Sequence, residues 1–458
     1  INISSHTSLN NKLQDDCENF SFVSHLNETG DLSIHDKLIC SPQSLNRVGN
    51  KKYDIVIVDE ACNIISQYSG KNFKDTLGTP SSCYKKLIDL CLHAKKVIFM
   101  DADLKHDLLQ MIINSVGDDL NDIKIYDIKD NKYLDYNYKI CRTEKTFLNN
   151  FYKHFDLGKR IYLPSASKEF ADAMYESIMK RNPERRVCYI SSDGVKRSYE
   201  DGILKDDGAI KDKSEYIKHL NTKLIDEDVE IWITTPTIVV GTSINDVIFD
   251  ITFAYFTPMS LPVEQSTQMI FRVRSVKDKE VYIGAYGVAW SNYNHLSVDE
   301  VKFHIENETD LFKKTSKDEY NINYVEDPIF AEVLTYNRYN KINSREAFGN
   351  ELIGVLERHN LNWEFVKDDK KATESVDDLL GDRKKIKYEK EEVFYNTLLI
   401  TIYDFLKLKK KMKDKTRTDL ITEEEQLQYF KMYTYLSINN IFIIPKKNSN
   451  GDMVESIN

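Results

Sequence analysis

The sequence predicts two α/β domains, each built on a parallel sheet, followed by a mostly helical C-terminal region. Its 458 residues are roughly two to three times the usual size of one domain. Short, nearly continuous apolar runs alternate with helical periods, as is typical of parallel strands covered on both faces. The alternation restarts near residue 140, and from about Ser291 glycine almost vanishes while charge density rises. We therefore expect domains over residues 1–140 and 141–290 and a helical extension over residues 291–458.

Short apolar runs bounded by polar segments predict the first sheet. Residues 1–3 have the pattern of a strand end, and further strands are expected at residues 38–40, 53–58, 96–100 and 123–128. Helical patterns at residues 8–19 and 84–93 lie between these strands. The resulting order of elements is that of a sheet with helices on its faces.

The second domain repeats this architecture without repeating the sequence. Its expected strands are residues 159–163, 187–190, 229–233, 247–254 and 281–283, with a helix at 168–180. Beyond it, periods of 3.6 residues at 327–334 and 344–357 predict helices. Residues 392–408 are expected to form an amphipathic helix that leads into a basic stretch at residues 407–417.

Composition excludes several classes of protein. A net charge of -10 rules out a strongly basic coat for nucleic acid, and no apolar run approaches the ~18 residues that span a bilayer. The seven cysteines form no Cys-x-x-Cys pair, and the histidines form no zinc motif. No signal peptide is recognisable at the start of the sequence. We expect a soluble, intracellular protein of the cytoplasm or nucleus, without a membrane partner.

Two adjacent carboxylates are the strongest candidate site. The apolar strand at residues 53–58 delivers Asp59 and Glu60 at its C-terminal end, where parallel sheets bind ligands. Phosphoryl transfer uses such a pair, with Asp59 holding Mg²⁺ through its water shell and Glu60 orienting the attacking water. The alternative is an ordinary strand end whose acidic pair caps the next helix.

Polar and charged side chains also follow the neighbouring strands. They are Ser41, Gln43 and Ser44 after strand 38–40, Asp101 and Asp103 after 96–100, Thr235, Gly241 and Thr242 after 229–233, and Gln268, Arg272 and Arg274 in the next helical stretch. Arginines suit triphosphate recognition because the guanidinium is permanently charged and forks onto oxygens. The alternative for the two arginines is a solvated pair.

In order and spacing these motifs resemble those of superfamily 2 helicases. Residues 59–62 resemble the DEAD/DEAH box, residues 101–103 match the Ser/Thr-Ala-Thr motif in position, and residues 235–243 and 268–274 resemble the fifth and sixth motifs. The closest similarity is to the herpesvirus-type replication origin-binding proteins and their relatives in large DNA viruses and mobile elements. It is carried by residues 3–9, 40–45, 58–68, 99–103 and 268–275, and it covers about residues 1–290.

The resemblance implies two RecA-like domains that clamp ATP and Mg²⁺. It makes Asp59 and Glu60 catalytic, with Arg272 or Arg274 stabilising charge on the γ-phosphate. It also implies nucleotide contacts from Gln268 and Gly241, and coupling of hydrolysis to movement through Asp101 and Asp103. Contacts to DNA phosphates are implied for Ser41, Gln43, Ser44, Ser165, Thr235 and Thr242.

The sequence departs from the family pattern in three places. Arg272 and Arg274 are two residues apart, whereas the family spaces its arginines three apart. The acidic residue that usually follows the glycine of the fifth motif is replaced around Thr242. No Gly-x-x-x-x-Gly-Lys-Ser/Thr phosphate loop is present. We expect this loop and its strand to lie before residue 1, so that residues 1–458 alone hydrolyse ATP negligibly.

Three functional hypotheses remain open. The first is an ATP-dependent DNA helicase or translocase of replication initiation, with single-stranded or origin duplex DNA and other replication proteins as partners. The second is a catalytically inert helicase-like module for DNA binding or assembly. The third is an RNA helicase or a restriction-type translocase.

The basic stretch at residues 407–417 is a second candidate DNA contact. It holds seven basic residues against one acid in an acidic chain, and Lys409, Lys410 and Lys411 form its centre. The alternative is the solvated end of a helix, because lysines favour helix C-termini.

Overall fold

The structure is a computed structural model, and it divides the chain into two compact units, Ile1–Ala372 and Thr373–Asn458. No helix in the described parts of the chain is long and apolar enough to cross a membrane. The described residues are 1–4, 18–69, 79–102, 104, 106–116, 124–126, 133–200, 203–204, 213–236, 243–258, 260–285, 287–288, 297–299, 328–369, 376, 379, 381, 383, 396–397, 399–400, 402–413, 422–438, 443–447 and 453–457.

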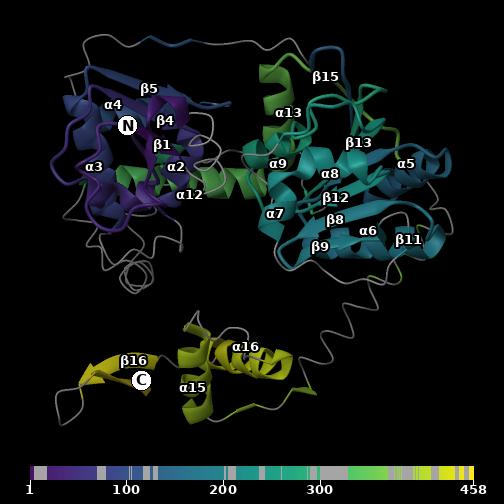
Figure 1. Ribbon diagram of the computed structural model, residues 1–458. Coiled ribbons are helices and arrows are strands. Elements are labelled where there is room, and N and C mark those ends of the chain that lie inside the picture. The colour runs from purple at the N-terminus through teal and green to yellow at the C-terminus, as the bar shows by residue number, and fades with distance from the viewer. Residues whose placement is uncertain are drawn as a thin grey trace. The chain divides into compact units, whose positions relative to one another are not determined.

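The first sheet has five parallel strands in the order β2-β3-β1-β4-β5. The strands are β1 (Asn2–Ser4), β2 (Val23–Ser24), β3 (Leu38–Cys40), β4 (Ile55–Asp59) and β5 (Lys96–Met100). Helices α2 (Ala61–Gln67), α3 (Pro80–His93) and α4 (His106–Val116), with the 3₁₀ segments η1 (Glu18–Phe20) and η2 (Pro42–Val48), belong to the same part of the chain (Figure 1). We call this assembly the first domain.

The core of the first domain explains why these segments become strands. Val56 and Val58 of β4 are fully buried, and so is Ile3 of β1, as expected for strands covered on both faces. Tyr84 and Leu87 of α3 belong to the same hydrophobic cluster. The strands predicted at residues 38–40, 53–58 and 96–100 are confirmed, although β4 begins at Ile55.

The strand predicted at residues 123–128 is wrong for the part that the structure describes. Residues 124–126 have no strand conformation, and the side chains of Ile125 and Tyr126 are 69% and 79% exposed. A short apolar run forms a strand only where a neighbouring strand satisfies its backbone, and here no described strand lies beside it. The helix predicted at residues 8–19 lies mostly outside the described residues.

The second sheet has eight strands in the order β15-β6-β14-β13-β7-β12-β8-β9. All neighbours are parallel except β8 and β9. The strands are β6 (Asn137–Cys141), β7 (Ile161–Pro164), β8 (Val187–Ser191), β9 (Gly194–Arg197), β12 (Ile231–Thr234), β13 (Ile251–Phe256), β14 (Glu280–Ala285) and β15 (Asn362–Phe365), while β10 (Tyr199–Glu200) and β11 (Ile203–Leu204) pair with each other.

Helices α5 (Glu144–Asp156), α6 (Lys168–Arg181), α7 (Lys213–Lys218), α8 (Leu220–Asp226) and α9 (Val263–Ile270) accompany this sheet. Thr143 and Ser167 cap α5 and α6 by accepting hydrogen bonds from the backbone three residues on. The predicted helix at 168–180 and the predicted second sheet are confirmed, although β13 begins at Ile251 and not at residue 247. We call this assembly the second domain.

Two consecutive helices, α12 (Pro328–Glu346) and α13 (Phe348–Arg358), join the two domain cores. Phe330 and Val333 of α12 belong to the hydrophobic cluster of the first domain. Phe348 and Leu352 of α13 belong to the cluster of the second. Both predicted helical stretches, 327–334 and 344–357, are therefore confirmed as helices. Their apolar side chains add to the hydrophobic cores of the two α/β domains.

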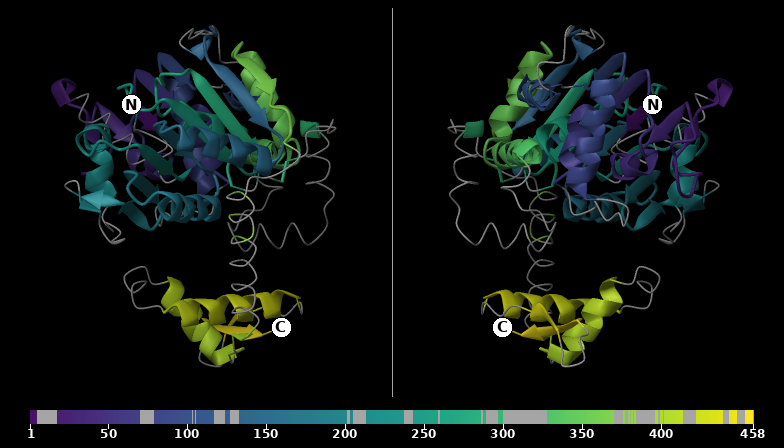
Figure 2. Two further views of the ribbon diagram at one scale, coloured as in Figure 1. Left: turned by 90° about the vertical axis from the view of Figure 1, so that its right-hand side faces the viewer. Right: turned by 90° about the vertical axis from the view of Figure 1, so that its left-hand side faces the viewer.

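The second unit, yellow in Figure 2, contains α15 (Ile402–Lys413), α16 (Glu423–Ile438) and an antiparallel hairpin of β16 (Ile443–Lys447) and β17 (Met453–Ile457). The rings of Phe405 and Tyr429 stack with centroids 5.0 Å apart and join the two helices. The single helix predicted at residues 392–408 is wrong, because residues 399–400 are not helical and α15 begins at Ile402. β-branched side chains at residues 400–402 lower helix propensity there.

Candidate active site

The acidic pair stands at the junction of β4 and α2. Asp59 is the last residue of β4, and Glu60 is the N-cap residue of α2. Glu60 adopts the left-handed conformation, with φ 58° and ψ 56°, which costs a non-glycine residue on the order of 1 kcal/mol. The Ile64 amide donates to the Glu60 carbonyl at 3.0 Å, and the Asn63 amide group donates to its carboxylate at 3.4 Å. The Glu60 carboxylate is thereby held over the first turn of α2, where Asn63 contacts it.

The environment of Asp59 disfavours its negative charge. Burial raises the pKa of the Asp59 carboxyl, and the negative charges of Glu60 and Asp101 raise it further. A hydrogen bond from the Glu60 amide acts in the opposite direction. Carboxylates gathered in this way are stabilised by a cation.

Asp101 links the end of β5 to α2. The Cys62 amide, in the first turn of α2, donates to the Asp101 carboxylate at 2.8 Å. This amide is one of the donors that a helix start leaves without an intrahelical partner. Asp101 thereby fixes the start of α2, next to Glu60. Asp103, the other predicted coupling residue, lies outside the described residues.

The two predicted arginines lie on a short segment after α9. Residues Ile244 and Val273 form an isolated parallel bridge, with Ile244 donating to the Arg272 carbonyl at 2.7 Å and Arg274 donating to the Ile244 carbonyl at 2.9 Å. Arg272 belongs to the turn that ends α9 and Arg274 follows the bridge, and the charge of Arg274 acts on the Arg272 guanidinium. Arg274 also donates to the Ser243 hydroxyl at 3.1 Å.

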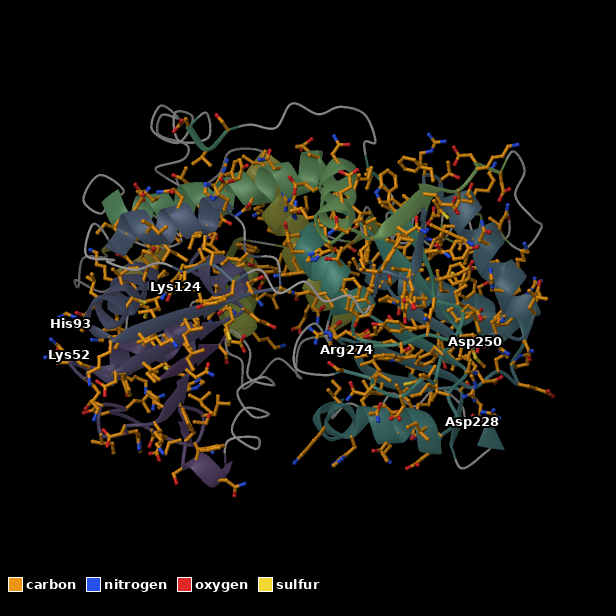
Figure 3. All side chains as sticks on the ribbon, turned by 90° about the horizontal axis from the view of Figure 1, so that it is seen from above. Lys52, His93, Lys124, Asp228, Asp250 and Arg274 are labelled. Atoms are coloured by element: carbon orange, nitrogen blue, oxygen red, sulfur yellow. The ribbon has the colours of Figure 1, made fainter. Side chains whose placement is uncertain are left out.

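Arg272 of the second domain lies within electrostatic range of Glu60 of the first domain. Burial lowers the pKa of the Arg272 guanidinium, while the negative charge of Glu60 acts in the opposite direction. An arginine keeps its proton under such conditions. Arg274 is labelled in Figure 3, at the margin of the second domain that faces the first. Glu60 and Arg272, which are far apart in the sequence, are thus close enough to interact.

The structure also places the residues predicted to contact DNA. The hydroxyls of Ser41 and Ser44 are buried and hydrogen-bond to each other at 3.2 Å. Gln43 donates to the Gln67 side chain at 3.0 Å. The buried hydroxyls of Ser165 and Thr235 donate to backbone carbonyls. In this conformation the four hydroxyls are engaged within the fold, and so are the backbone amides of Ser44, Ser165 and Thr235.

The remaining predicted site residues are scattered or undescribed. Gln268 is half-buried on α9, five residues after its start. Gly241 and Thr242 lie outside the described residues, as do the side chains of Lys409 and Lys410. Lys411 forms an ion pair with Glu425, with 2.7 Å between Nζ and a carboxylate oxygen.

Two residues of α12 were missed in the sequence. Asn337 donates to the Ile65 carbonyl of α2 at 2.9 Å, and Ser344 accepts a hydrogen bond from the Val263 amide of α9 at 3.3 Å. The sequence did contain a signal for them, because both polar residues lie on the apolar stripe that Phe330 and Val333 begin along the helix. A buried polar residue on an apolar helix face calls for a partner.

Part of the chain matches one protein-family model. Residues 9–125 match a family model described as origin of replication binding protein. The chain resembles the origin-binding proteins. This confirms the resemblance that the motifs predicted.

Two similar viral proteins support the same resemblance. A helicase/primase complex protein, so named, of African swine fever virus is 26% identical over 71% of this chain and 29% of its own length. A replication origin-binding protein, so named, of Acanthamoeba polyphaga mimivirus is 22% identical over 61% of this chain and 33% of its own length. The chain therefore spans about a third or less of these relatives. It is similar to helicase-like replication proteins.

Among solved structures, S. cerevisiae Dbp5 bound to RNA and ADP BeF3 matches 84% of this chain and 81% of its own, with 12% identity and a TM-score of 0.40. A likeness of this degree carries no argument about function.

The carboxylates fit a magnesium ion that is shared with a nucleotide. The described residues contain no group of three or more His, Cys, Asp or Glu side chains placed to hold a metal by themselves. Mg²⁺ bound with a nucleotide needs only one or two protein carboxylates, because water and phosphate oxygens complete its shell. Asp59, with its raised pKa beside two further acids, provides such a carboxylate.

Proposed function

We propose that this chain is the motor region of an ATP-dependent DNA helicase or translocase that acts in replication initiation. The observation that supports it most is that the charge of Glu60, in the first domain, acts on Arg272, in the second. A site assembled from two domains can couple hydrolysis to their relative movement. We take residues 1–140 and 141–290 as its two RecA-like domains and residues 291–458 as its extension.

Each site residue has a role in this proposal. Asp59 holds Mg²⁺ through water, and the ion neutralises charge on the phosphates when the nucleotide is bound. Glu60 orients the water that attacks the γ-phosphorus and accepts its proton. Arg272 stabilises the negative charge that develops on the transferred phosphoryl group. Arg274 donates a hydrogen bond to Ser243 and so connects the segment that carries the two arginines with the segment of the fifth motif. Gln268 and Gly241 contact the nucleotide, and Asp101 and Asp103 transmit its state.

The phosphate loop comes, in this proposal, from sequence outside residues 1–458. The edge strand β5 supports this. Val97, Ile98 and Phe99 are only half-buried and Met100 is 41% exposed, and among the described residues no strand pairs with the outer side of β5. An apolar edge of this kind is suited to one further parallel strand.

DNA and other replication proteins are the proposed partners. The similarity to viral origin-binding and helicase/primase proteins supports both. The hydroxyl and amide groups predicted to contact DNA would follow its phosphates without reading sequence. The hydroxyls of Ser41, Ser44, Ser165 and Thr235 would exchange their partners in the fold for phosphate oxygens.

An inert DNA-binding or assembly module is the second candidate. Asp101 favours it, because an acid that accepts the Cys62 amide stands where the family has a hydroxyl residue. Such a change would weaken the coupling between nucleotide and movement.

ATP hydrolysis by the natural protein that contains residues 1–458 separates the two candidates. We expect DNA-stimulated hydrolysis that falls about 100-fold or more in Glu60→Gln, because the positioned base is removed. Glu184→Gln, an exposed position of the second domain, is the control and should behave as wild type. Absence of DNA-stimulated hydrolysis in the wild type, or full activity in Glu60→Gln, would favour the inert module. Matched RNA and DNA strands in the same assay identify the nucleic acid.

A further inference from the structure

Helix α12 contacts both of the helices that carry the candidate active site. Its N-terminal half is buried against the first domain, and it leads through Ala347 into α13, which is buried in the second. Figure 1 shows α12 in green, running along the first domain toward α9. The helix is therefore placed to relate the two domains.

The contact with the first domain goes through Asn337. This side chain is only 8% exposed, and it donates to the Ile65 carbonyl of α2 at 2.9 Å. Glu60 is the N-cap residue of the same α2. Because α2 is a short helix of seven residues, a contact in its last turn controls the orientation of its first.

The contact with the second domain goes through Ser344. This side chain is 7% exposed, and its hydroxyl accepts a hydrogen bond from the Val263 amide at 3.3 Å. Val263 is the first residue of α9, and the preceding Pro262 makes no side-chain cap. Ser344 thus caps α9 from another helix. The chain leaves α9 toward Arg272.

The two contacts lie on one face of a single helix. Residues 337 and 344 are seven apart, which is close to two turns, so that they point in the same direction about 10 Å from each other. The neighbouring Tyr336 is buried, and its pKa is raised by burial and further by Cys62 of α2 and Glu264 of α9, so that it lies near both helices. A helix held at two points in this way is a spacer of fixed length.

We propose that α12 is a strut that sets the position of Glu60 relative to Arg272, with Asn337 and Ser344 as its positioning residues. The inference rests on the proposed function, since it concerns the geometry of that site. Neither residue touches the nucleotide. Each acts through the helix to which it is bonded, Asn337 through α2 and Ser344 through α9.

Steady-state hydrolysis by the natural protein tests the strut. Asn337→Asp keeps the size of the side chain and removes its donor, and Ser344→Ala removes the acceptor. In each we expect kcat to fall about tenfold, the equivalent of one lost buried hydrogen bond, with little change in the KM for ATP. Lys341→Ala, at an exposed position of the same helix, is the matched control and should leave both constants unchanged.

A double-mutant cycle distinguishes positioning from loss of stability. Once Arg272→Ala has removed the group that is being positioned, adding Asn337→Asp should have little further effect on the single-turnover rate. Additive losses in the cycle, or an unchanged kcat in both single variants, would overturn the inference.

Amide hydrogen exchange tests the strut without any reliance on hydrolysis. Asn337→Asp alters a contact to α2 only, yet a strut would transmit the change, so that exchange in α9 also becomes faster. Faster exchange confined to α2 would overturn the inference. If the wild type shows no ATP hydrolysis but α9 responds in this way, the proposed function fails while the strut stands.

Discussion

At Asp59 and Glu60 the surroundings oppose the charge of one residue and the usual backbone conformation of the other, as is typical of a functional site. A strand end that placed acids only to cap a helix would leave them exposed and Glu60 in an ordinary conformation. Instead, burial and two neighbouring acids raise the pKa of Asp59, and Glu60 is held in the left-handed region. Groups whose environments oppose their charge gather at functional sites more than elsewhere. The pair thus favours function over the capping alternative.

Replacing Asp59 should stabilise the protein. Its folded-state pKa lies above the unfolded value, so between the two values the native protein binds more protons and stability falls as the pH rises. Asp59→Asn should therefore have a larger free energy of unfolding than wild type at pH 7, and the difference should shrink as the pH falls below the folded-state pKa. Urea denaturation at pH 7 and in the acidic range measures this. A variant less stable than wild type at pH 7 would contradict the raised pKa.

At the scale of elements, strands with two buried faces were predictable and segments that depend on distant partners were not. The run at 53–58 contains its own evidence, because four apolar residues lead directly into Asp59 and Glu60. The run at 123–128 looked similar, but its described residues meet no neighbouring strand. Asn337 and Ser344 are tied to the site only through contacts 272 and 81 residues away in the sequence, with Ile65 and with Val263. Local patterns do not specify such pairings.

Gly284 in β14 allows a prediction about the packing of a helix on a strand. A Cβ atom there would lie 2.6 Å from Cδ2 of Phe147 on α5, which packs directly over the strand. Gly284→Ala should lower the free energy of unfolding by about 1–3 kcal/mol through overpacking. Gly354→Ala in α13 is the control, because its Cβ would meet only Arg358 at an ordinary 3.6 Å and alanine favours a helix. Equal stability of Gly284→Ala and wild type in urea denaturation would contradict the packing.

For the basic stretch at residues 407–417, we predict different effects of replacing neighbouring lysines. Lys411 is engaged with Glu425 in the second unit. We expect Lys409→Gln combined with Lys410→Gln to weaken DNA binding regardless of sequence. The slope of log K against log salt should flatten by up to about two contacts. Lys411→Gln should change that slope little. Fluorescence anisotropy over a salt series measures both, and an unchanged slope in the double variant would leave the stretch as a solvated surface.

At the scale of the whole molecule, the account depends on two domains sharing one site. The sequence placed the acids on one domain and the arginines on the other, and the structure brings Glu60 and Arg272 within electrostatic reach. The bridge between Ile244 and Val273 holds the residue between the two arginines against the segment of the fifth motif. The folding of α12 and α13 into the two cores adds a connection that the charged, glycine-poor sequence after residue 291 did not indicate.

The most direct test of the shared site is the turnover of an Arg272→Ala variant of the natural protein. An arginine that stabilises the transferred phosphoryl group contributes about 10³-fold or more to kcat, so we expect a loss of this order, with ATP affinity within a few-fold of wild type. Arg274→Ala, which removes the neighbouring guanidinium bonded to Ser243, should lose less. Unchanged DNA-stimulated turnover in Arg272→Ala would contradict a site built from both domains.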